Sequence, residues 1–136
     1  MTNEELALVI NGALRNAGII VHHLGCDPIG DQYIKLAYGI FKTIRVGNTE
    51  SNKYLSKWEI GPHIKTRQVV DQKGMTRHLY PDTDWKILVA DIKAEKDALL
   101  ASIGTSQWLK MVRKHRRWAK QASFGKDWFW TKVQPG

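Results

Sequence analysis

Apolar residues near the start of the chain recur three and four residues apart, which is the spacing of one buried helix face. This face consists of Leu6, Val9, Ile10, Ala13, Leu14 and Ala17. Thr2 or Asn3 can cap the helix, and Glu4 and Glu5 stand in its first turn, where the helix dipole favours negative charge. Gly18 suits the left-handed position that often follows a helix, so an N-terminal helix is expected.

The middle of the chain changes to a period of two, which is typical of strands. Between Tyr33 and Val46 the apolar positions are Ile34, Leu36, Tyr38, Ile40, Ile44 and Val46. The pattern predicts one strand, or two strands folded at Gly39. Further strands are expected at 19–23, at 54–60, and at 64–70 and 75–80, the last two forming a hairpin around the turn DQKG. We therefore expect an antiparallel sheet of about four or five strands.

Helical spacing returns after Pro81. Thr83 can cap a helix whose apolar stripe runs from Trp85 to Ile103, and Gly104 would close it. Thr105 or Ser106 would then cap a final helix that ends near residue 122. This order of elements predicts an α+β fold with one N-terminal helix, the sheet, and two C-terminal helices.

The 136 residues are enough for one hydrophobic core, so we expect a single domain over residues 1–136. The chain has no apolar run of membrane-spanning length, and its N-terminus lacks the basic start and apolar core of a signal peptide. Its lone cysteine, Cys26, fits a reducing compartment. These features favour a cytoplasmic protein without a membrane partner.

The charge is concentrated at the C-terminal end. Residues 105–136 carry eight Lys or Arg against the single acid Asp127, a balance of +7 out of the chain's net +8. The same segment holds four of the six tryptophans. Cations mixed with large flat rings suit a partner that offers both phosphates and bases.

Within the last predicted helix the cations fall on one side and the apolar residues on the other. Trp108, Met111, Val112, His115, Ala119 and Ala122 share the apolar side. The basic side, which we call the basic stripe, consists of Lys110, Arg113, Lys114, Arg117 and Lys120. No acid lies between Thr105 and Gln121 to offset these charges. Such a stripe could follow a phosphate backbone, or it could be an ordinary solvated face above Trp108 and Trp118 in the core.

The tail that follows contains the aromatic cluster Asp127, Trp128, Phe129 and Trp130. Its rings could form a stacking platform or an anchor at a protein interface. The more usual role of such a cluster is a terminal clasp that docks rings on the sheet, and we favour that interpretation.

A second candidate site lies at the predicted strand end FKTIRVGNT. Lys42 and Arg45 are cations beside a glycine turn, whose amides together with Asn48 could receive a phosphate or a carboxylate. Trp58, on the next strand, could add a stacking surface for a small phosphorylated ligand. The competing interpretation is a plain hairpin turn with exposed Lys and Arg side chains.

Metal binding and catalysis find little support. His22, His23 and Cys26 are close together, but structural zinc normally needs two such ligand pairs and only one is visible. Asp27 and Asp31 could do acid and base work with these histidines, yet nothing ties them to a nucleophile. We expect no enzyme, no metal and no cofactor.

The stretch from Tyr33 to Trp58 resembles small phage and prophage accessory proteins, in which a Tyr-x-Lys strand is followed by a strand ending in Ile-Arg-Val or Ile-Arg-Ile. The matching positions are Ile44, Arg45 and Val46, whereas the next three residues depart from that pattern. The resemblance implies an anti-defence protein of the host cytoplasm. Such a protein could sequester a cyclic nucleotide through Lys42, Arg45 and Trp58 at a site shared by two copies of the chain.

The primary hypothesis is a non-catalytic nucleic-acid binder that uses the basic stripe. The alternatives are the nucleotide-sequestering phage protein and a module that meets an acidic protein, for example by blocking a nucleic-acid-binding defence protein. An acidic protein surface and a nucleic acid ask for the same cations, so the sequence alone leaves these partners open.

Overall fold

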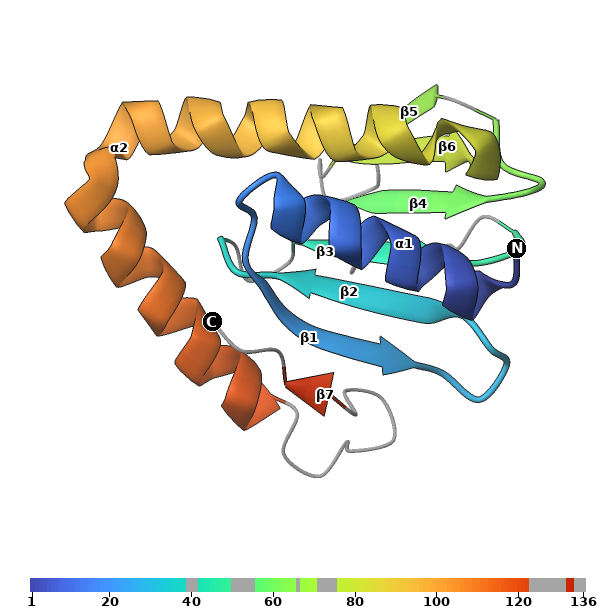
Figure 1. Ribbon diagram of the computed structural model, residues 1–136, viewed down its shortest axis with the longest axis horizontal. Coiled ribbons are helices and arrows are strands. Elements are labelled where there is room, and N and C mark those ends of the chain that lie inside the picture. The colour runs from blue at the N-terminus through green and yellow to red at the C-terminus, as the bar shows by residue number, and fades with distance from the viewer. Residues whose placement is uncertain (39–41, 50–55, 66, 71–75, 123–131, 134–136) are drawn as a thin grey trace.

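The computed structural model describes residues 1–38, 42–49, 56–65, 67–70, 76–122 and 132–133, without the side chains of residues 67–70, 118–122 and 132–133. Figure 1 shows one sheet covered by helices. In chain order the elements are α1 (Asn3–Asn16), β1 (Val21–Cys26), β2 (Gln32–Leu36), β3 (Thr43–Val46), β4 (Trp58–Gly61), β5 (Arg67–Val70), β6 (Thr76–Pro81), a 3-10 turn η1 (Asp82–Asp84), α2 (Trp85–Ala122) and β7 (Lys132–Val133). The α+β class is as expected.

Helix α1 forms where the apolar spacing predicts it. Thr2 is its N-cap: the Thr2 hydroxyl accepts from the Glu5 amide, and the Glu5 carboxylate accepts from the Thr2 amide. Gly18 follows the helix with φ of 79°, the left-handed conformation that glycine adopts without strain. Leu6, Ile10 and Leu14 are buried against the sheet, as the spacing predicts, whereas Val9 of the predicted buried face is 37% exposed.

The sheet is mixed rather than antiparallel, which corrects the sequence-based expectation. Its seven strands lie in the order β5-β6-β4-β3-β2-β1-β7. The pairs β1–β2, β2–β3, β5–β6 and β1–β7 are antiparallel, so the predicted hairpins are present, but β3–β4 and β4–β6 are parallel. Parallel neighbours need a crossover of about a dozen residues. The segments 47–57 and 62–75 supply that length, and hydrophobic periodicity carries no information on strand direction.

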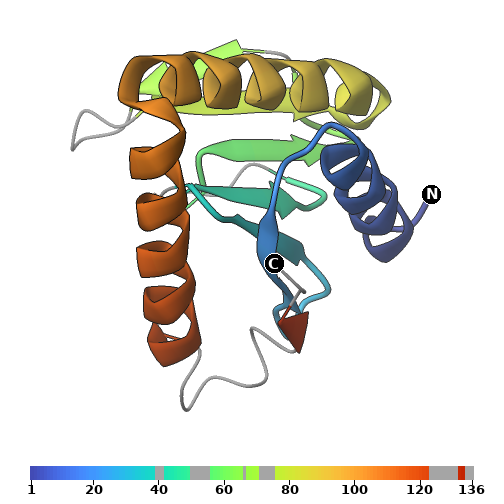
Figure 2. The same cartoon turned by 60° about the vertical axis from the view of Figure 1, so that its left-hand side comes forward.

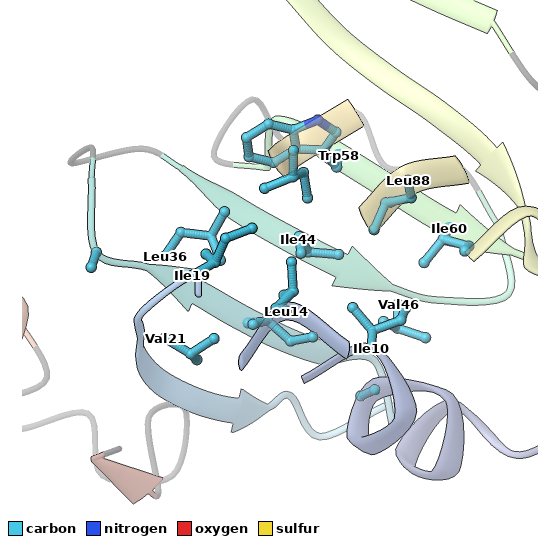
Figure 3. Close-up of a cluster of buried hydrophobic side chains, with 14 of the residues drawn as sticks. Ile10, Leu14, Ile19, Val21, Leu36, Ile44, Val46, Trp58, Ile60 and Leu88 are labelled. Atoms are coloured by element: carbon cyan, nitrogen blue, oxygen red, sulfur yellow. The ribbon is translucent and has the colours of Figure 1, made fainter. Parts of the chain in front are cut away.

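The two faces of the sheet differ in chemistry because successive side chains of a strand point to opposite sides. One face packs against α1 and the start of α2, and Figure 3 shows its cluster of Leu36, Ile44, Val46, Trp58 and Ile60 around Ile10, Leu14 and Leu88. We call the opposite side the polar face. It carries Tyr33, Lys35, Thr43, Arg45, Glu59 and Arg77.

Helix α2 spans 38 residues but is bent at Gly104, whose φ of 82° and ψ of 163° are non-helical. Residues 85–103 form a first limb above β4 and β6, and residues 105–122 form a second limb that turns sharply away (Figure 1). The expectation of two C-terminal helices is thus only partly matched, because a single glycine replaces the separate capped start at Thr105. Thr83 lies in the 3-10 turn rather than at a helix cap.

The second limb and α1 lie on opposite sides of the strands in Figure 2. Trp108 and Val112 of this limb are each 7% exposed and complete the core at the β1–β2 end of the sheet. In the described part of the chain, no helix combines the length and the apolar character required to cross a bilayer.

Replacing Ile44 in the centre of the sheet tests this core. Ile44 is fully buried, so Ile44→Ala should lower the free energy of unfolding by about 2–5 kcal/mol through lost burial and the cavity left behind. Leu8→Ala on α1 is the matched control, because Leu8 is 51% exposed and should cost less than about 1 kcal/mol. Urea denaturation measures both, and equal losses would contradict this packing.

Candidate functional site

The basic stripe lies on the solvent side of the second limb. The side chains of Lys110, Arg113, Lys114 and Arg117 are all exposed, while Trp108 and Val112 on the opposite side are buried. Residues three, four and seven positions apart share one helix face, so these four cations form a continuous row. Lys120 continues the same helix, and its side chain lies outside the described part of the structure.

No ion pair joins these four cations to a carboxylate within the described residues. The first limb is different, because Lys93 and Lys96 both contact Asp97. The two limbs of one helix therefore differ in whether their charges are balanced. The first limb balances its charge locally, and the second leaves a row of like charges facing solvent. Like charges at these spacings destabilise an isolated helix by a few tenths of a kcal/mol per pair.

Aromatic contacts hold the second limb in place. The ring of Trp108 packs at a tilt on Tyr38, with 5.6 Å between the ring centroids. The ammonium group of Lys96, on the first limb, lies over the Trp108 ring, 5.9 Å from the ring centroid. The alternative interpretation of this helix is a solvated basic face above Trp108 and Trp118 in the core, and Trp108 is buried as that interpretation requires. The side chain of Trp118 and the aromatic residues 127–130 lie outside the described residues.

Three basic side chains lie where this limb meets the sheet. His22 on β1 and Lys35 on β2 are 1% and 2% exposed, and His115 on the limb is half-buried. Burial, with the nearby Lys35 charge, lowers the pKa of His22 to about 4, and burial, with the Lys42 charge, lowers the pKa of Lys35 to about 7. Burial and Lys35 also lower the pKa of His115. The protein therefore favours the neutral forms of these groups under the limb.

Arg45, the centre of the second candidate site, is buried and bound to the protein's own carboxylates. Its Nε and Nη2 donate to Asp31 Oδ2 at 3.1 and 2.6 Å, and its Nη1 donates to Glu59 Oε1 at 3.0 Å. Nη1 also donates to the backbone oxygen of Thr49 at 2.6 Å. Arg77 binds the other oxygen of Glu59 at 2.5 Å. Burial by itself lowers the pKa of Arg45, but the hydrogen bonds and charge of Asp31 and the charge of Glu59 outweigh it and raise the pKa, so Arg45 stays charged.

The other members of that candidate site are dispersed. Trp58 is 1% exposed in the core, and Lys42 pairs with Glu95 of α2 while its ammonium group lies 5.4 Å from the Trp58 ring centroid. Asn48 is exposed at the strand end. The structure therefore does not bring Lys42, Arg45, Asn48 and Trp58 together around one open surface.

Gly47 lies in the glycine turn that the sequence offers as an anion-binding site, and in the structure it has a packing role. A Cβ atom at Gly47 would lie 2.7 Å from the Arg45 guanidinium carbon and 2.9 Å from Asp31 Oδ1. At the neighbouring strand end, a Cβ on Gly61 would collide with the Gly47 carbonyl oxygen. Gly61 has no room for a side chain because β3 and β4 end in close backbone contact there, where the Gly47 amide donates to the Ile60 carbonyl. At Gly47 a side chain would displace the end of the Arg45 side chain from its pair with Asp31.

The acidic and metal-binding candidates are likewise absorbed into the fold. Asp27 accepts from the amides of Ile29 and Asp31 and from the Tyr33 hydroxyl, which organises the β1–β2 loop. Asp31 is held by Arg45. His22 and His23 are both about 1% exposed, and the described residues contain no group of three His, Cys, Asp or Glu side chains placed to hold a metal ion.

Sequence reasoning missed the charged network on the polar face. Lys35 and Arg45 occupy the odd positions of the period-two pattern, which ordinarily indicate a solvent-facing side. A face with Arg, Glu and Lys in successive strands offers a signal for ion pairing, but the partners Asp31, Glu59 and Arg77 are far apart in sequence. Only the strand order brings them together.

Glu59→Gln tests the network by removing one negative charge with little change in shape. Glu59 is fully buried between Arg45 and Arg77, so the variant should lose about 3 kcal/mol or more of unfolding free energy. Asp97→Asn removes the surface ion pairs with Lys93 and Lys96 and should leave the free energy of unfolding nearly unchanged. Denaturant titration of both variants measures the two losses of unfolding free energy. A Glu59→Gln variant as stable as the wild type would contradict the structural role of the network.

The lowered pKa of Lys35 predicts a pH-dependent stability. The unfolded chain holds the Lys35 proton up to about pH 10.5, whereas the folded protein loses it near pH 7, so unfolding takes up a proton between these values. The free energy of unfolding should therefore rise by about 2 kcal/mol from pH 7 to pH 9. Lys35→Met should remove this rise, and the exposed Lys110→Met should retain it. Urea titrations at fixed ionic strength measure the slopes, and parallel curves for the three proteins would contradict the assignment.

Comparisons of the chain with protein-family models, with curated proteins and with solved structures give no match, so the interpretation of the site depends on its own geometry and charge.

Proposed function

We propose that this protein is a non-catalytic nucleic-acid-binding domain, in which the basic stripe of the second limb lies along a phosphate backbone. The observation that carries the proposal is the row Lys110, Arg113, Lys114 and Arg117, exposed and without an ion-pair partner in the described part of the chain. Cations that are not neutralised by the protein's own acids remain available to an external polyanion.

The spacing of the row suits an elongated partner. Lys110 and Arg117 are about 10 Å apart along the helix axis, from a rise of about 1.5 Å per residue. Four cations over this length form a linear charge array rather than a pocket for one small anion. Each phosphate contact releases condensed counterions, which supplies affinity in water and makes it strongly dependent on salt. Contacts of this kind position a nucleic acid without reading its sequence.

The limb is also held rigidly enough to present the array. Trp108 and Val112 anchor it in the core, and Trp108 packs between Tyr38 and Lys96. A surface that is already ordered loses little conformational entropy when it binds. The anchoring residues and the cations occupy opposite sides of the same helix, so binding does not require the core to open.

Two alternatives make different demands. Sequestration of a cyclic nucleotide through Lys42, Arg45, Asn48 and Trp58 would use one exposed side chain, Asn48, and three that are already engaged inside the fold. Binding of an acidic protein would use the same basic stripe, and it differs from nucleic-acid binding in the identity of the captured partner. The geometry therefore favours the helix over the strand end as the binding surface.

Arg113→Ala, Lys114→Ala and Arg117→Ala combined should weaken binding to a single- or double-stranded oligonucleotide at least about 30-fold at low salt. The slope of log affinity against log salt should become shallower by about two to three units, because up to three phosphate contacts are lost. Fluorescence anisotropy over a salt series measures both quantities. Unchanged affinity in the folded triple variant would overturn the proposal.

A matched control removes the same number of positive charges from positions outside the second limb. Lys65→Ala, Lys86→Ala and Lys93→Ala combined remove three exposed cations outside the second limb and should leave the affinity within about threefold of the wild type. Equal losses in both triple variants would show that net charge, and not the stripe, governs binding. Capture experiments with and without nuclease then separate a nucleic-acid partner from an acidic protein.

A further inference from the structure

A single residue separates the two limbs of α2. Gly104 is the one position inside the 38-residue helix with non-helical dihedral angles. Its φ of 82° lies in the region that favours glycine, and a Cβ built on it would meet no heavy atom within 4 Å. The bend is therefore imposed by backbone conformation at one residue and not by a side chain wedged into the helix.

The bend decides where the second limb docks. Lys96 of the first limb lies over the ring of Trp108 in the second, 5.9 Å from its centroid. In a continuous helix these two residues would be about 18 Å apart along the axis. The Trp108 contact with Tyr38 and the proximity of the Val112 backbone to His22 likewise depend on the limb folding back. Straightening α2 would remove all these contacts from the same chain.

We propose that the second limb is an exchangeable arm: α2 can straighten at Gly104 and dock its second limb on another copy of this chain. The second copy returns its own limb to the first, so Trp108 of each copy packs on Tyr38 of the other. β7 follows the limb along the chain and pairs with β1, so it is exchanged together with the limb. The contacts of the limb and of β7 with the sheet are kept, and only the connection through residue 104 changes. Such reciprocal exchange gives a closed two-fold dimer.

Glycine at position 104 favours the bent monomer for two reasons. It adopts a φ of 82° without the steric penalty of a side chain, and it is among the poorest residues in the interior of a straight helix. The exchanged dimer keeps the same docking contacts but loses the freedom of two separate molecules. The bent monomer should thus dominate in dilute solution, with exchange appearing when unfolded chains refold at high concentration.

Gly104→Ala should reverse this preference. Alanine is strained at the bend and favourable in a straight helix, and both chains of the dimer contribute, so the dimerisation constant should rise by at least about 100-fold. Gly12→Ala is the matched control, since Gly12 lies inside α1, away from the bend, and a Cβ there would meet nothing within 4 Å. Size-exclusion chromatography with light scattering should show a dimer for Gly104→Ala and a monomer for Gly12→Ala.

A cross-link distinguishes exchange from side-by-side association. Lys96→Cys and Leu109→Cys, in a Cys26→Ser background, place thiols on both sides of the bend, one in place of Lys96 in the Lys96–Trp108 contact and one at the residue after Trp108. A short bismaleimide should join them within one chain in the monomer. In the Gly104→Ala dimer it should join two chains, and the product should run as a dimer under denaturing conditions.

The wild-type protein gives a test that does not depend on the folding of Gly104→Ala. Refolding it from denaturant at millimolar concentration, followed by dilution in the cold, should trap a dimer fraction that rises with refolding concentration. A Gly104→Ala protein that stays monomeric, or a dimer cross-linked only within single chains, would overturn the proposal. If Gly104→Ala fails to fold, a wild-type protein that remains monomeric after concentrated refolding would also overturn it. None of these measurements involves nucleic acid, so this inference and the proposed function can fail separately.

Discussion

The Arg45 guanidinium group connects parts of the chain that would otherwise be separate. It stands on β3, donates to Asp31 in the loop before β2, and donates to Glu59 on β4, which in turn accepts from Arg77 on β6. An isolated charge in this buried position would cost several kcal/mol, so each member of the network requires the others. The network spans the parallel junctions β3–β4 and β4–β6, where the connections between strands are long. It therefore specifies the strand order at the place where local turns cannot.

The difference between the two faces of the sheet also explains where the helices pack. Apolar residues on the other face pack against α1 and the first limb of α2, and they form an ordinary hydrophobic core. The second limb passes to the side of the buried bases His22 and Lys35, where Trp108 and Val112 supply the apolar contacts. Burial beneath this limb, together with the Lys35 charge near His22 and the Lys42 charge near Lys35, lowers the pKa values of both bases and favours their neutral forms. The stability of this part of the fold therefore depends on pH.

Cations of the same type have two different environments in this chain. Arg45 and Arg77 are held by internal carboxylates and act as structural elements, whereas Arg113 and Arg117 face solvent on a helix whose inner side is anchored in the core. This division favours the second limb as the surface for an anionic partner. It also places the proposed binding surface on the limb that begins after the bend at Gly104. Exchange of that element would carry two basic stripes into one dimer.

The local elements could be predicted from the sequence, because capping, periodicity and turn residues act over a few neighbours. The Thr2 cap, the buried positions of α1, the β5–β6 hairpin and the break at Gly104 all follow from such short-range signals. The helical spacing of Lys110, Arg113, Lys114 and Arg117 was likewise visible in the sequence. Contacts between distant segments set the parallel pairing of β3 with β4, the burial of Lys35, and the binding of Arg45 by Asp31 and Glu59. These features depend on which distant segments become neighbours, and side-chain periodicity specifies a face of a strand but not what will cover it.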